Sequence, residues 1–295
     1  MTRGTAGKVI LVMFLWAICF PLITLGIQDA PHLTFATLRA ALAGSALLMF
    51  AVFLRRPMPR SISVWANIVA IGLGATTLGF FGMFHAAEFV SPGIATVIAS
   101  TQPLMAALLA YAFLGEALEV RGKIGLLLGF FGIVVIALPG FAVGGGGSYQ
   151  AGIAYVFLAA LGITVSNVLI KRLGDRADPL MAMGWQMMIG SIPLGVLALL
   201  SERPSEIIWS NQFIVSLISL SLAGTALVYW LWSAVLQKVE LNRANAFSFL
   251  VPIFGLSMGM VFFDENLGWL EISGIILSLA GIYLVKESQI RQVPV

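Results

Sequence analysis

Apolar stretches of about 20 residues recur along almost the whole chain, and the charged residues gather in the short segments between them. A helix of that length crosses a hydrocarbon core of roughly 30 Å. The pattern therefore predicts an all-α integral membrane protein with ten transmembrane helices. The expected spans are residues 8–27, 32–54, 62–84, 91–114, 120–139, 150–170, 179–200, 212–236, 243–263 and 268–286.

The sequence also repeats itself with an offset of 149 positions. The segment that begins at Gly82 reappears without a gap, so that Pro103 corresponds to Pro252 and Glu116 to Glu265. Two halves with five spans each must lie in the membrane with opposite orientations, and such inverted repeats are common in secondary transporters. We expect two five-helix repeats joined by a glycine-rich connector, with the boundaries 1–140, 141–149 and 150–295.

The basic residues predict the orientation of the chain. Of the 16 Lys and Arg residues, 14 fall on one side of the membrane if the N-terminus is cytoplasmic. Because cytoplasmic loops carry the excess of Lys and Arg, both termini are expected in the cytoplasm. The net charge of +3 follows from this asymmetry and gives no reason to expect nucleic acid as a partner.

The sequence gives no sign of an enzyme, because no room remains outside the spans for a soluble catalytic domain. Cys19 is the only cysteine, His32 and His85 are the only histidines, and no HExxH motif is present. A hydrolase needs a base beside a nucleophile, and a structural metal site needs several thiolate or imidazole ligands. We therefore expect no catalytic residues, no cofactor and no metal.

Polar side chains inside the predicted spans are candidates for a substrate cavity, because polar groups are costly in hydrocarbon and usually face the bundle interior. The fourth span offers Thr101 and Gln102, its repeat partner offers Asn245 and Ser248, and the sixth span offers Asn167. Contacts between helices are the alternative role for these residues.

Glycines four residues apart occur in the fifth span, at Gly125 and Gly129, and in the ninth span, at Gly255 and Gly259. Small residues at this spacing let helix backbones approach closely in lipid. We expect both pairs at contacts between helices. The second pair also matches the G-x-S-x-G nucleophile motif, but that motif needs a strand-to-helix turn and a partner His, and here it lies within a span.

Aromatic residues within the spans form a second group of candidates. Trp16, Phe20, Trp185 and Tyr229 lie inside spans rather than only at their ends. Aromatic faces with a few polar groups suit a small apolar or aromatic ligand. Ordinary packing is the alternative for each of them.

Three charged or titratable residues toward the outer side are candidates for a charge or proton role. Arg39 could pair with an acidic side chain or receive a substrate carboxylate. His85 and Glu88 could form a protonation site, or else take part in a hydrogen bond of a loop. Prolines inside spans remove a backbone hydrogen bond and are expected to act as hinges. The three prolines chosen as hinges are Pro21, Pro103 and Pro252.

A tryptophan in the first span and a proline followed by a short acidic motif in each half form a recognisable set. They are Trp16, Pro103 with Leu114-Gly115-Glu116, and Pro252 with Phe263-Asp264-Glu265. In these features the chain resembles the drug/metabolite transporter (DMT) superfamily and its EamA-type branch, and it is most similar to the YddG-type exporters of aromatic and other neutral amino acids. The resemblance implies a bacterial cytoplasmic (inner) membrane protein that exports a small-molecule substrate, with membrane lipid as its other partner.

The leading hypothesis is therefore a secondary transporter that exports small neutral or aromatic metabolites, amino acids in the first place, by alternating access around a midplane cavity. A multidrug or cation exporter is an alternative, although the first span has no acidic residue between Lys8 and Gln28. A carrier of other small metabolites and a non-transporting membrane partner are further alternatives. Ten helices can enclose a complete pathway, so a monomer suffices, and a dimer is also compatible with the sequence.

Overall fold

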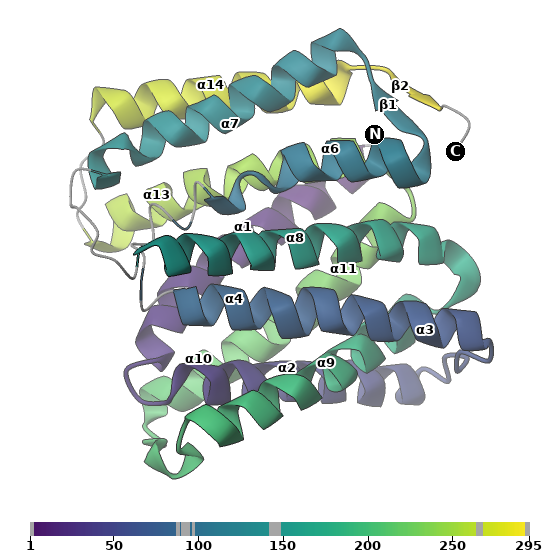
Figure 1. The fold of residues 1–295 in the computed structure, drawn as a ribbon, viewed down its shortest axis with the longest axis vertical. Coiled ribbons are helices and arrows are strands. Elements are labelled where there is room, and N and C mark those ends of the chain that lie inside the picture. Colours follow the sequence, from purple (N-terminus) through teal and green to yellow (C-terminus); the bar gives the residue numbers. More distant parts are fainter. Residues whose placement is uncertain are drawn as a thin grey trace.

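The computed structural model describes residues 3–86, 89, 95, 98–141, 149–263 and 268–292, and these residues form a bundle of helices (Figure 1). The α-helices are α1 (Arg3–Gly26), α2 (His32–Phe53), α3 (Ile62–Ile71), α4 (Gly79–Ala86), α6 (Gln102–Leu114), α7 (Val120–Phe141), α8 (Tyr149–Leu173), α9 (Pro179–Ser201), α10 (Asn211–Ser221), α11 (Val228–Leu236), α12 (Leu241–Ala246), α13 (Leu250–Phe263) and α14 (Trp269–Glu287). The π-helical segments are η1 (Gly72–Leu78) and η4 (Leu222–Leu227), the 3₁₀-helical segments are η2 (Gly174–Arg176), η3 (Pro204–Glu206) and η5 (Phe247–Phe249), and the strands are β1 (Glu116–Leu118) and β2 (Ile290–Gln292).

Seven helical segments of the described part are long and apolar enough to cross a membrane. Every predicted span contains a helix, although α6 fills only the second half of the predicted fourth span. The prediction of a helical membrane protein with several spans is therefore confirmed. The seven segments are residues 4–26, 32–53, 62–86, 150–176, 179–201, 211–236 and 269–287.

The third and eighth predicted spans each contain a π-helical segment, and the two segments occupy equivalent positions of the sequence repeat. Thr76 lies in η1 and Thr225 lies in η4, 149 residues further on. The Thr225 hydroxyl donates to the carbonyl of Leu220, 2.8 Å away and five residues earlier. π-Helical turns are rare and are often found at functional sites. Their occurrence in both halves therefore makes the surroundings of these threonines candidates for a functional site.

The fourth and ninth predicted spans are interrupted just before their repeated prolines. Helix α6 begins at Gln102, so Pro103 lies in its first turn, and Ser100 and Thr101 just before it form a turn. In the other half, η5 separates α12 from α13 three residues before Pro252. Proline lacks an N–H group and its ring clashes with the carbonyl four residues earlier, which explains both interruptions. Pro21, in contrast, lies inside the continuous helix α1.

Helices α7 and α14 pack against each other backbone to backbone (Figure 1). A Cβ atom on Gly132 would lie 2.6 Å from the carbonyl oxygen of Gly274, and one on Gly125 would lie 2.8 Å from that of Gly281. The close packing expected at Gly125 is therefore present. The expectation for Gly255 is wrong, because a Cβ atom there would meet no described atom within 4 Å. The surroundings of Gly259 lie outside the described residues.

The bundle has two ends that differ in their contacts. At one end, β1 pairs with β2 in antiparallel register (Figure 1). At the other end, the connections 27–31 and 202–210 meet, and the Ile208 N–H donates to the carbonyl of Asp29 over 2.7 Å. We call these the Glu116 end and the His32 end.

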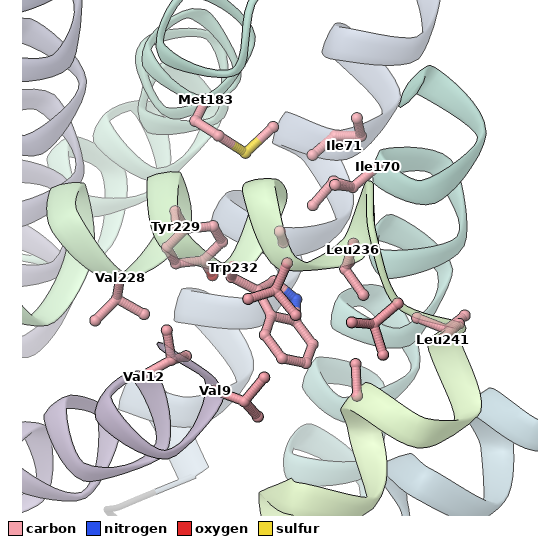
Figure 2. Close-up of a cluster of buried hydrophobic side chains, with 14 of the residues drawn as sticks. Val9, Val12, Ile71, Ile170, Met183, Val228, Tyr229, Trp232, Leu236 and Leu241 are labelled. Carbon is pink, nitrogen blue, oxygen red and sulfur yellow. The ribbon is translucent and has the colours of Figure 1, made fainter. Parts of the chain in front are cut away.

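A buried apolar cluster fills the bundle toward the Glu116 end. Figure 2 shows Trp232 and Tyr229 of α11 among side chains from α1, α3, α8, α9 and α12. The Trp232 side chain is almost fully buried. The neighbouring side chains include Val9, Val12, Ile71, Ile170, Met183 and Leu241.

Candidate substrate cavity

A cavity lies between the middle of the bundle and the His32 end. It offers about 170 Å³ to the centres of water-sized molecules, far more than the roughly 15 Å³ that one water needs. Its lining is mainly apolar and comes from both halves of the chain. The lining residues are Trp16, Cys19, Ile23, Arg39, Gly79, Phe80, Met83, Phe84, Ala99, Ser100, Gln102, Ile163, Tyr229, Ser248, Val251 and Pro252.

Six residues named from the sequence meet at this cavity although they come from five different predicted spans. They are Trp16, Arg39, Gln102, Tyr229, Ser248 and Pro252. Helix α1 contributes Trp16, Cys19 and Ile23, whose spacing of three and four residues places them on one face. The Trp16 ring lies 6.3 Å from that of Tyr229, edge to face, and therefore forms part of an aromatic wall.

Arg39 is the charged residue of this lining, and only 5% of it is exposed. Its Nε donates to the Thr225 hydroxyl over 2.7 Å, and its Nη2 donates to the Gly224 carbonyl over 3.4 Å. These acceptors belong to η4, so the π-helical segment holds the guanidinium. The centroid of the Phe80 ring lies 4.8 Å from the guanidinium carbon, within range of a cation–π interaction.

Arg39 forms no ion pair with any carboxylate of the described residues. Asp29, an acidic residue at the His32 end, instead accepts a hydrogen bond of 2.5 Å from the Ser210 hydroxyl. Glu88 lies outside the described residues. In the described part of the cavity, the groups that contact the Arg39 guanidinium are therefore all neutral.

Ser248 lies in η5, at the interruption before Pro252, and faces the cavity. Its hydroxyl oxygen is buried and has no hydrogen-bond partner in the described part of the chain. A buried polar group without a partner is unusual in a folded protein. Ser248 is therefore a group that a ligand could satisfy.

Asn167 and Asn245 contact each other but do not line the cavity. The Asn167 amide Nδ2 donates to Asn245 Oδ1 over 3.4 Å, and the Trp232 indole N–H donates to Asn167 Oδ1 over 2.8 Å. The Trp232 ring lies 5.4 Å from that of Trp16. These residues therefore form a polar layer behind Trp16, on the side of the Glu116 end.

Two further candidates, Trp185 and Thr101, are not among the lining residues. Trp185 of α9 packs against Trp65 of α3 with ring centroids 5.4 Å apart, outside the cavity lining. The Thr101 hydroxyl donates to the carbonyl of Ile98 over 2.6 Å, which ties it to its own chain segment. The side chain of Phe20 lies outside the described residues.

His85 belongs to a chain of polar contacts at the His32 end. Its Nδ1 lies 3.1 Å from Nε2 of His32, and Nδ1 of His32 lies 3.2 Å from a carboxylate oxygen of Glu202. The Glu202 carboxylate also accepts the N–H groups of Leu33 and Thr34 over 2.8 and 2.7 Å, which caps α2. Glu202 was not among the residues predicted from the sequence, although an acidic residue in a short outer loop was a signal for it.

Glu116 makes the corresponding kind of contact at the other end. Its carboxylate accepts the N–H groups of Leu241 and Asn242 over 3.1 and 3.2 Å, at the start of α12. Burial raises the pKa of the Glu116 carboxyl, while these two hydrogen bonds and the nearby Lys171 act in the opposite direction. Glu116, in the first half of the chain, thus caps a helix of the second half.

A bundle of apolar helices around a mostly apolar cavity with a few polar groups is typical of membrane transporters for small molecules. The model of the EamA-like transporter family matches this chain twice, over residues 6–138 and 150–286. The chain belongs to this family, as the resemblance implied, and is a multi-pass membrane protein of the transporter class.

Relatives cover nearly the whole chain. An uncharacterized transporter of Synechocystis is 30% identical over 94% of this chain and 88% of its own length. A probable amino-acid metabolite efflux pump of Escherichia coli is 26% identical over 96% of this chain and 95% of its own length. A solved crystal structure with 18% identity superposes with a TM-score of 0.80 over 96% of both chains, which shows that the fold is shared.

Proposed function

We propose that this protein is a secondary transporter that exports small neutral or aromatic metabolites, amino acids in the first place, across the bacterial inner membrane. The similarity to a probable amino-acid metabolite efflux pump supports the direction and the class of substrate. The observation that carries the proposal is the cavity itself, because it combines aromatic walls with a few polar groups at the junction of the two halves.

The arrangement of the halves supports ten spans in two inverted repeats with the predicted boundaries. Gly129 and Ser278 are 149 residues apart, and the Ser278 hydroxyl donates to the Gly129 carbonyl over 3.4 Å. Two equivalent residues touch each other when a twofold axis relates the two segments. The crossed glycine contacts of α7 and α14 have the same symmetry. Under this proposal both termini are cytoplasmic, and one chain encloses the whole pathway.

Transport would proceed by alternating access. In the described conformation the inner side is closed, so this state would be either outward-open or occluded. The cavity lies toward the His32 end, whereas Trp232, Asn167 and the Glu116 cap close the Glu116 end. Opening the inner side would separate these contacts and expose Asn245, whose Nδ2 is buried without a partner in the described part. The interruptions before Pro103 and Pro252 would serve as the bending points.

Counterflow in proteoliposomes tests this function. Purified protein is reconstituted, and uptake of labelled phenylalanine, tryptophan, leucine and choline is measured against the same unlabelled compound. We expect uptake of the amino acids and none of choline. Uptake of choline alone would replace the proposal by a cation exporter, and uptake of none of the four would favour a non-transporting role.

Two variants locate the site. Trp16→Ala removes a wall of the cavity and is expected to raise the apparent KM for phenylalanine. Trp65→Ala removes an aromatic residue of similar size that packs against Trp185, outside the lining. Equal effects of the two variants would show that the cavity is not the transport site.

A further inference from the structure

The Arg39 guanidinium is a buried positive charge without a described counter-charge. Arg39 is 5% exposed and lies within a helix that is long enough to cross the membrane. Its hydrogen-bond acceptors are the Thr225 hydroxyl, the Gly224 carbonyl and the Cys19 sulfur, all neutral. Ionised groups inside a membrane are costly and usually mark a substrate or ion pathway.

The guanidinium, which lines the cavity, also has donors that the described hydrogen bonds do not use. It carries five N–H groups in a fixed plane. The hydrogen bonds of Arg39 within the described part use Nε and Nη2, and none uses Nη1. The rings of Phe80 and Phe84, 4.8 and 6.0 Å from the guanidinium carbon, restrict its orientation. A planar acceptor with two oxygens matches donors held in this way.

The remainder of the lining has no negative charge. No aspartate or glutamate lies among the lining residues of the described chain. The Ser248 hydroxyl, buried and without a partner there, can donate to an anion or accept from an ammonium group. Side chains such as Ile23, Met83 and Val251 provide apolar surface beside the charge. The cavity thus has one positive charge, that of Arg39, beside a mainly apolar surface.

We propose that Arg39 binds the carboxylate of the substrate and that this carboxylate, rather than an ammonium group, is the obligatory polar feature. The class of ligand is a small monocarboxylate with an apolar body. It includes neutral amino acids and also the hydroxy or oxo acids of the same shape, and it excludes organic cations. The inference rests on the proposed use of this cavity as the transport site.

Four probes of one shape separate the two charged groups. Phenylalanine has both, phenyllactate has only the carboxylate, phenylalaninamide has only the ammonium and a neutral amide, and phenethylamine has only the ammonium. Binding to the purified full chain is followed by tryptophan fluorescence, since Trp16 lines the cavity, and by the ligand-induced change in Tm. We expect phenylalanine and phenyllactate to bind at least about 10-fold more tightly than the other two.

The variant Arg39→Gln removes the charge and keeps a polar side chain. We expect it to weaken binding of both carboxylates by about 10- to 100-fold, as for loss of a charge-assisted hydrogen bond, with less than about a threefold effect on phenylalaninamide. The control is Gln186→Leu, because the Gln186 side chain accepts from Thr76 of the other π-helical segment over 2.9 Å, outside the cavity lining. We expect that control to keep the preference for carboxylates.

The outcomes separate this inference from the proposed function. Tight binding of phenyllactate without transport of amino acids would support the inference and refute amino acid export. Transport of phenylalanine that is competed equally by phenylalaninamide would refute the inference and leave the function standing. Failure of all four probes to bind would overturn the inference. If Arg39→Gln does not elute as a folded protein, the ranking of the four probes by the wild-type chain decides.

Discussion

The Glu116 cap gives a prediction in which the effect of a single side chain can be worked out from the structure. Glu116 is 2% exposed, and its carboxylate accepts the first N–H groups of α12, from Leu241 and Asn242. The variant Glu116→Ala leaves these two donors without an acceptor. Loss of a helix N-terminal cap costs about 1–2 kcal/mol. The change should act on the first turn of α12 and on the closure of the Glu116 end.

A loss of that size is large enough to be measured. About 1–2 kcal/mol corresponds to a roughly 5- to 30-fold change in an equilibrium constant. Part of the loss is offset, because the variant also removes a carboxylate whose burial is unfavourable, as its raised pKa indicates. We therefore expect the lower half of that range for the opening of α12.

Hydrogen exchange of the peptide that contains residues 241–246 is the assay. Glu116→Ala should speed exchange there by about 5- to 10-fold. The control is Glu119→Gln, which removes a partner of the exposed ion pair with Arg291 near the same connection and should change exchange little. Unchanged exchange in Glu116→Ala, or equal acceleration in both variants, would refute the assignment of Glu116 as the cap.

Three further predictions concern packing and pH. Gly132→Ala should destabilise the protein by about 1–3 kcal/mol, because its Cβ would collide with α14, whereas Gly255→Ala should not; thermal unfolding in detergent compares the two. The free energy of unfolding should rise as the pH falls from above the raised pKa of Glu116 to the ordinary value of 4.5, because the folded chain binds the proton more tightly than the unfolded chain. Glu116→Gln, which has no carboxyl group at this position, should lack this rise. Trp232→Phe should cost about 1–3 kcal/mol by leaving the buried Asn167 oxygen without its donor, and an unchanged Tm would count against that hydrogen bond.

Arg39 illustrates how far the sequence could lead toward the site. A lone arginine inside an apolar span is visible in the sequence, and the cost of a charge in hydrocarbon makes it a candidate without any coordinates. Its partners could not be named, because Thr225 lies 186 residues away and presents its hydroxyl from a π-helical segment. A change of the backbone hydrogen bonds from a spacing of four residues to one of five leaves no clear mark in an apolar sequence, so η1 and η4 were not predicted.

The aromatic and amide candidates show the same limit. Trp16 and Trp185 are equally plausible in the sequence, yet one lines the cavity and the other packs against Trp65. Asn167 and Asn245 contact each other behind Trp16 rather than in the cavity lining. The direction in which a side chain points depends on the rotation of its helix within the bundle. In a chain that is apolar on most faces, hydrophobic periodicity gives little information about that rotation.

The membrane class, the helical segments, the internal repeat and the family could be predicted without coordinates, because these depend on the length of apolar runs, on the period of the repeat and on short local motifs. Which polar groups meet is visible only in the folded structure. It joined Arg39 to the second half, placed Ser248 without a partner at the cavity and brought Glu202 to the start of α2. These contacts link residues far apart in the chain, and only the packing of the two halves against each other specifies them.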